Sequence, residues 1–215
     1  WKMAEVENSK DLISVLWSGA DILRSKMDAN EYKDYLLGIV FYKYLSDSFL
    51  IKVYDLIYDE RPANLMVALD AYREALEDES AGELQEQLRS EFHYVIEPEL
   101  TYTCFADEAR NNAFQREQLQ KAFNNIEQSD PLFADLFTDI DLYSNRLGTG
   151  DQKQSDTIAN LILEIDKADL LDSDAEILGN AYEYLIGQFA SETGKKAGEF
   201  YTPQAVSKIL TKIAI

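Results

Sequence analysis

One helical pattern, from Glu31 to about Tyr58, constrains the fold of this chain more than any other stretch of its sequence. Its central part, Leu36-Leu37-Gly38-Ile39-Val40-Phe41-Tyr42, is apolar on all sides rather than along one stripe. A helix of this kind is stable in water only when other helices surround it, because any exposed side would carry large apolar groups. Arg61-Pro62 ends the pattern. The stretch therefore predicts a helical bundle in which the small Gly38 allows another helix to approach closely.

Apolar residues at helical spacing predict further helices on both sides of this stretch. The first runs from a cap at Ser9 to about Met27, and a turn at residues 28–30, with Asn30 as cap, leads into the central helix. The others are one or two acidic helices over residues 64–92, a helix from Asp107 to about Glu127, a helix capped by Ser155 that buries Ile158, Leu161, Ile162 and Ile165, and a helix that starts at Asp172-Ser173-Asp174.

Two segments depart from helical spacing. Tyr94–Glu97 and Leu100–Thr103, broken at Pro98, favour a short hairpin or a packed loop. The connection from Pro131 to Gly150 is rich in apolar residues, so we expect it to pack on the core through Phe133, Leu136, Phe137, Ile140, Leu142 and Tyr143. Leu147-Gly148-Thr149-Gly150 lacks the third glycine and the preceding strand of a dinucleotide-binding turn, which favours a loop that leads into a helix. The predicted fold class is mainly α, with at most a short hairpin.

The charge is unevenly distributed along the chain. The net charge is −20, yet residues 194–215 hold four lysines against Glu199 alone, a charge of +3 that leaves −23 for the preceding residues. A phosphate-binding surface needs clustered Lys and Arg, so a helix-turn-helix type of DNA binding is not favoured for the acidic part. The contrast favours a domain boundary near residue 193, with one domain at 1–192 and the start of another at 193–215.

Cysteine and histidine usage narrows the chemistry. Cys104 and His93 each occur once, which excludes an internal disulfide framework and a structural zinc site, and we expect His93 at or near the surface. No run of about 18 apolar residues and no signal peptide occur, so we expect a cytoplasmic protein without a membrane partner. The chain starts at Trp1 and stops at Ile215 inside an apolar helical pattern, from which we expect a piece of a longer protein.

The segment Gly194-Lys195-Lys196-Ala197-Gly198-Glu199-Phe200-Tyr201-Thr202-Pro203 predicts a glycine-rich loop that runs into a helix. Thr202 is a good helix cap, and Pro203 suits the first helical position. The free N–H groups of a helix start attract an anionic group such as a carboxylate or a phosphate.

Three stretches together resemble one family, in the same order along the chain. They are Leu16-Trp17-Ser18-Gly19-Ala20-Asp21-Ile22-Leu23-Arg24 with the helix 32–47, then Leu178-Gly179-Asn180-Ala181-Tyr182-Glu183-Tyr184-Leu185-Ile186, then the loop Gly198-Glu199-Phe200-Tyr201-Thr202-Pro203. They are similar to the modification subunit of type I restriction–modification systems, an S-adenosylmethionine-dependent adenine-N6 DNA methyltransferase. The resemblance implies that 1–192 is the N-terminal helical domain and that 193–215 form the first loop and helix of an α/β methyltransferase domain.

The same resemblance implies a cofactor site and a set of partners. The cofactor-binding residues would be Glu199, Phe200, Tyr201, Thr202, Pro203 and Gln204, with Phe200 and Tyr201 packed on S-adenosylmethionine. The family's catalytic Asn-Pro-Pro-Phe/Tyr motif and its Gly-x-Gly cofactor strand do not occur in this sequence, so no catalytic residue is predicted and this segment alone is expected to be inactive. Implied partners are a specificity subunit, a second modification subunit, a restriction subunit and, through the complex, double-stranded DNA.

Two other functions compete with this interpretation. The net charge of −20 suits a non-enzymatic acidic helical interaction protein or DNA mimic, which would need no further domain. A self-contained hydrolase or metalloenzyme would need a nucleophile–base pair or a ligand set, and the scattered carboxylates supply neither.

Overall fold

The computed structural model describes residues 2–168, and this part of the chain folds into seven α-helices and two short 3-10 helices without a strand. The helices are α1 (Lys2–Arg24), α2 (Ala29–Tyr58), α3 (Leu65–Leu76), α4 (Ala81–Phe92), α5 (Tyr102–Arg110), α6 (Arg116–Ser129) and α7 (Asp151–Ile165). The 3-10 helices are η1 (Pro98–Leu100) and η2 (Pro131–Phe133). The predicted mainly α fold class is confirmed.

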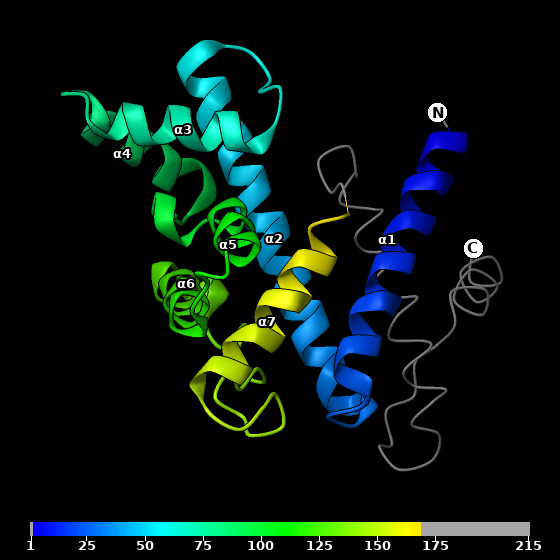
Figure 1. Ribbon diagram of the computed structural model, residues 1–215. Coiled ribbons are helices and arrows are strands. Elements are labelled where there is room, and N and C mark those ends of the chain that lie inside the picture. Colours follow the sequence, from blue (N-terminus) through cyan, green and yellow to red (C-terminus); the bar gives the residue numbers. More distant parts are fainter. Residues whose placement is uncertain (1, 169–215) are drawn as a thin grey trace, which may run out of the picture.

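The long helix α2 is the centre of the domain. Figure 1 shows α1 and α7 beside one half of α2, α5 against its middle, and α3 and α4 at its other end. The side chains of Leu36, Ile39, Tyr42, Phe49 and Val53 on α2 are fully buried. The prediction of a central helix surrounded by others is confirmed.

Several predicted helix starts are wrong by a few residues. Ser9 lies inside α1, and α2 starts at Ala29 after Asp28, so Asn30 lies within the helix rather than at its cap. Ser155 is buried inside α7, which begins at Asp151 directly after Gly150. Gly150 has φ 91°, a value that favours glycine, and the prediction that residues 147–150 lead into a helix is confirmed.

The region from Tyr94 to Glu127 differs most from expectation. It forms no hairpin: η1 follows an extended loop, and Thr101 caps α5 by accepting a hydrogen bond from the N–H of Cys104 at 3.3 Å. The single helix predicted from Asp107 is two helices, because the chain breaks between Arg110 and Arg116, where Asn112 takes the left-handed conformation at φ 55°. The predicted option of a packed loop followed by helix is closer to the structure than the hairpin.

The connection between η2 and α7 packs on the core, as its apolar content predicts. Phe137, Ile140, Leu142 and Leu147 are buried, and the ring of Phe137 stacks on Phe123 with centroids 4.0 Å apart. Leu136 and Tyr143 are exposed, contrary to expectation. Gly38 does allow a close approach, but of Ile140 from this connection and not of another helix.

Candidate functional site

The residues predicted to bind the cofactor, Glu199 to Gln204, lie outside the described residues, as does the helix predicted from Asp172. The domain boundary at 192/193 also lies outside them and stays a prediction. Within residues 2–168, two clusters combine ion pairs with an aromatic ring under a cation.

The first cluster surrounds the C-terminal end of α7. We name it the α7 clamp, and its members are Lys43 on α2, Asp47 on α2, Tyr102 and Arg110 on α5, and Asp166 directly after α7. The Nζ of Lys43 donates to Oδ2 of Asp47 at 2.6 Å and lies 3.5 Å from Oδ1 of Asp166. The Lys43 and Asp47 side chains are only 4% and 2% exposed, so this pair is removed from water.

Two further contacts complete the clamp. The ammonium of Lys43 lies 4.9 Å from the centre of the Tyr102 ring, and Arg110 forms an ion pair with Asp166. The Tyr102 hydroxyl donates to the carbonyl of Ile162 at 2.8 Å. Burial, followed by the charges of Asp166 and Asp47, raises the pKa of Tyr102 well above its ordinary value, so this hydroxyl remains a hydrogen-bond donor at neutral pH.

A pocket of about 410 Å³ adjoins the clamp. Clamp residues form part of its wall together with residues at the start of α3 and with Ala168. The cations and carboxylates of the clamp pair with one another, and the further cation in the pocket wall, Lys167, pairs with Glu164. The polar residues of this wall hold helices together, and the lining residues include no nucleophile–base pair.

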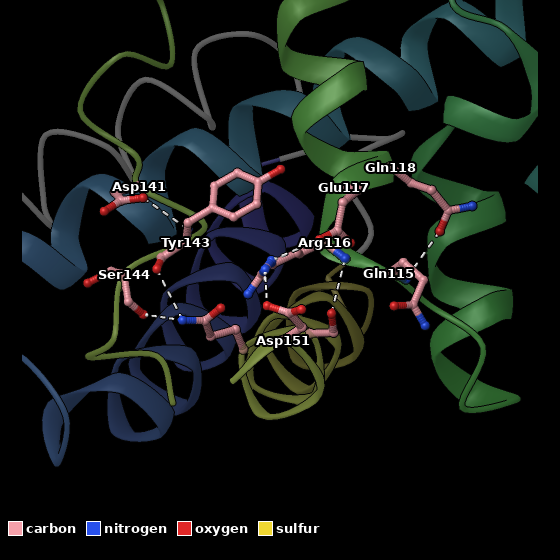
Figure 2. A network of polar contacts seen from close by, with 10 residues as sticks. Gln115, Arg116, Glu117, Gln118, Asp141, Tyr143, Ser144 and Asp151 are labelled. Atoms are coloured by element: carbon pink, nitrogen blue, oxygen red, sulfur yellow. Dashed lines mark hydrogen bonds and ion pairs between the residues drawn. The ribbon is translucent and has the colours of Figure 1, made fainter. Parts of the chain in front are cut away.

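The second cluster centres on Arg116, the first residue of α6. Figure 2 shows Arg116 between Tyr143 and Asp151. Its Nη2 donates to Asp151 at 2.6 Å, its Nε donates to Glu117 at 3.1 Å, and its guanidinium lies 4.5 Å from the centre of the Tyr143 ring. Gln154 donates to the carbonyls of both Tyr143 and Ser144 at 3.1 Å. The cluster ties α6, the start of α7 and the connection between them together.

The remaining side chains that often serve as nucleophiles or bases, Cys104 and His93, do not form a catalytic arrangement. Cys104 is buried, and burial raises the pKa of its thiol, which disfavours the nucleophilic thiolate. The side chain of His93 is 58% exposed and lies 3.4 Å from Asp130, which confirms the expected surface position. No group of three potential metal ligands occurs among the described residues, and no helix in that part of the chain is long and apolar enough to cross a membrane.

Sequence reasoning did not single out Lys43, Arg116 or Asp166. The local sequence does mark two of them as unusual. Arg116 places a positive charge at the start of α6 and Asp166 places a negative charge at the end of α7, and both interact unfavourably with the helix dipole. Such charges need compensation from elsewhere in the fold, and each has it here. The geometry thus defines a purely helical domain, within the described residues, whose elements are fastened by internal ion pairs.

The chain belongs to the HsdM N-terminal domain family, which its sequence matches over residues 12–165. Residues 173–214 match a second family, N-6 DNA Methylase. The resemblance drawn from the three sequence stretches is thereby confirmed.

Named relatives agree with this assignment. The chain is 29% identical to the type I restriction enzyme MpnII methylase subunit of Mycoplasma pneumoniae, over 93% of this chain and 38% of that protein. It is 30% identical to the MjaVIII methylase subunit of Methanocaldococcus jannaschii, over 99% of this chain and 32% of that protein. The chain therefore spans well under half the length of these curated relatives.

A solved structure shows the same fold. The crystal structure of the type I restriction–modification system methyltransferase subunit from Streptococcus thermophilus superposes with a TM-score of 0.88 at 49% sequence identity. The match covers 96% of this chain and 43% of that one.

Proposed function

We propose that this chain is the N-terminal part of a type I restriction–modification DNA methyltransferase subunit that transfers a methyl group from S-adenosylmethionine to adenine N6 in DNA. The observation that carries the proposal is the order of the two family matches, a helical domain at 12–165 followed by N-6 DNA Methylase at 173–214. The alternative of an acidic interaction protein rests on net charge alone and gives no reason for the second match.

The helical domain would serve assembly rather than chemistry. The exposed side of α3, α4 and the turn between them is acidic, with Glu74, Glu77, Asp78 and Glu83 in contact with water. Such a face complements a basic surface on a specificity subunit better than it complements phosphate. A second modification subunit, a restriction subunit and double-stranded DNA would join through the same cytoplasmic complex.

The cofactor would lie against the loop that begins the methyltransferase domain at 193–215. Phe200 and Tyr201 would pack on S-adenosylmethionine, and the helix start at Thr202 and Pro203 would offer N–H groups to its methionine carboxylate. Glu199 and Gln204 flank this segment and complete the proposed cofactor-binding set.

Calorimetric titration of the full-length subunit with S-adenosylmethionine tests the cofactor loop. The variant Tyr201→Ala/Thr202→Ala is expected to bind at least tenfold more weakly, a loss of about 1.4 kcal/mol. The matched control, Tyr58→Ala/Thr138→Ala, changes the same residue types at exposed positions of the helical domain and is expected to bind normally. Equal affinity of both variants would refute the role of the loop.

The reaction itself needs a separate assay, performed on the subunit with its specificity partner. Labelled methyl groups from S-adenosylmethionine should appear in DNA as N6-methyladenine after enzymatic digestion to nucleosides. Label in cytosine would refute the adenine assignment, and absence of both label and cofactor binding would favour the acidic interaction protein.

A further inference from the structure

We propose that the α7 clamp fixes the direction in which the chain leaves the helical domain toward the region that matches N-6 DNA Methylase. The inference rests on the proposed function in one respect, namely that the residues after 173 belong to the methyltransferase region of the same subunit. The clamp would thus be the mechanical coupling between the two regions.

The polar contacts by which the clamp reaches α7 lie at the last turn of this helix and at the residue directly after it. The carbonyl of Ile162 accepts from Tyr102, and Asp166 is bound by both Lys43 and Arg110. The donors come from α2 and α5, so two independent helices grip one helix end. The middle of α7 is held by apolar packing, since Ile158 and Leu161 are fully buried in the core.

Asp166 would destabilise the C-terminal end of an isolated helix. A carboxylate beside the partial negative charge of a helix C-terminus is unfavourable, and Asp166 is the C-cap residue of α7. A residue that breaks a local rule is commonly retained for a purpose elsewhere in the structure. Lys43 and Arg110 offset the unfavourable interaction of Asp166 with the helix dipole only while the end of α7 lies in this position relative to α2 and α5.

The buried ammonium of Lys43 links α2 to the end of α7, because it pairs with Asp47 one turn along its own helix and also with Asp166. Removal of two charges from water is costly, and well-packed apolar residues of similar size often hold helices at least as firmly. What the contact between Lys43 and Asp166 adds is a preferred geometry between α2 and the end of α7, since the attraction weakens as the two charges separate. The adjoining pocket of about 410 Å³ leaves part of this junction unfilled, so the polar contacts add to the burial of Ile162 and Ile165 in holding the helix end.

The clamp can be tested through Arg110, whose side chain is 53% exposed, so its removal should leave the core intact. Arg146 is a matched control: it is equally exposed, at 53%, and also forms an ion pair with a residue distant in sequence, Glu31. The full-length subunit would be compared as wild type, Arg110→Ala, Arg146→Ala and Arg110→Lys, with Asp166→Asn as a second route to the same loss.

Trypsin under native conditions reports on the helix end, because Lys167 is a cleavage site directly beside Asp166. Loss of the clamp should accelerate cleavage after Lys167 about three- to tenfold, as expected when a hydrogen-bonded ion pair no longer opposes local opening. Arg146→Ala should cleave at the wild-type rate, and Arg110→Lys should recover most of the protection.

The direction of the chain is measured separately by distances between spin labels at Glu86→Cys and Lys208→Cys in a full-length background without native cysteines, Cys104→Ala included. The clamp predicts a narrow distribution that broadens in Arg110→Ala and Asp166→Asn but not in Arg146→Ala. An unchanged distribution, or faster cleavage at all tryptic sites together with a lower melting temperature, would overturn the proposal in favour of general stability. Neither readout requires methyl transfer, so an inactive subunit would refute the proposed function without deciding this one.

Discussion

Substitution of Gly38 by alanine tests the close packing at the centre of α2. A Cβ at this position would lie 2.1 Å from Cδ1 of Ile140, well inside van der Waals contact, while its next neighbours are at 3.4 and 3.6 Å. Alanine is intrinsically better than glycine in a helix by about 1 kcal/mol. Overpacking of a buried site typically costs about 1–3 kcal/mol, so the net effect should be a destabilisation of about 0–2 kcal/mol.

A double-mutant cycle isolates the clash from the helix propensity. Ile140→Val deletes the clashing Cδ1 atom and alone should cost about 0.5–1.5 kcal/mol. In the Ile140→Val background, Gly38→Ala should become stabilising by up to about 1 kcal/mol, because only the gain in helix propensity remains. Gly82→Ala on α4 is the control for propensity, since its Cβ would meet no atom within 4 Å.

Urea unfolding of the 215-residue chain, followed by far-ultraviolet circular dichroism, gives the four free energies of the cycle. Two results would refute the reasoning. One is an equal stabilisation by Gly38→Ala and Gly82→Ala, and the other is the same effect of Gly38→Ala in the wild-type and the Ile140→Val backgrounds.

Three further predictions concern single residues. Phe123→Ala removes the stack on Phe137 and an edge contact with Tyr42, and should cost about 3–5 kcal/mol in urea unfolding, whereas Leu132→Ala at an 80% exposed site should cost almost nothing. Thr101→Ala removes the cap of α5 and should cost about 1–2 kcal/mol, with Thr101→Ser close to wild type; equal losses in both would contradict the capping role. Burial and the nearby Asp141 raise the pKa of Tyr35 from 10.0 to about 12, so the folded chain holds this proton where the unfolded chain loses it, and stability should be complete below pH 10 and decline as pH rises toward 12. Melting temperatures across this range should fall less steeply in Tyr35→Phe, and parallel curves would exclude Tyr35 as a source of the effect.

The central helix and the buried face of α7 were predictable because their apolar spacing leaves no alternative to burial. Ile158, Leu161, Ile162 and Ile165 were assigned to one face by spacing alone, and all four are fully buried. The packing of the 131–150 connection followed from the same reasoning, since its apolar residues could not remain in water. Only its surface residues Leu136 and Tyr143 departed from the expectation.

The start of α5 was not predictable from local pattern. Thr101, Tyr102 and Thr103 are residues that favour strands, yet the helix begins there because α2 supplies the hydrogen bonds. The Tyr42 hydroxyl donates to the carbonyl of Leu100 at 2.6 Å, and the Ser46 hydroxyl oxygen accepts from the N–H of Tyr102 at 2.8 Å. These partners lie more than fifty residues away in sequence, so tertiary contacts override the local preference.

The α7 clamp could not be predicted from the sequence for the same reason, since Lys43, Arg110 and Asp166 come from three distant parts of the chain. Sequence patterns locate apolar faces well because each residue contributes independently, whereas an ion pair exists only once the fold brings both partners together. The break between α5 and α6 is a different case. Asn111-Asn112 is a recognisable helix stop, and the left-handed Asn112 could have been anticipated.

The internal use of basic residues bears on what the helical domain can bind. The chain has 20 Lys and Arg against 40 Asp and Glu, and among the described residues Lys43 and Arg116 are buried in ion pairs. Others on the surface, such as Arg146, Arg110 and Lys52, also face carboxylates of the same domain. A cation that is already paired contributes little to phosphate binding, because it has no surplus charge with which to release counterions from DNA. The acidic surplus consequently faces outward, which supports a role in docking to basic protein surfaces and leaves DNA contact to other parts of the proposed complex.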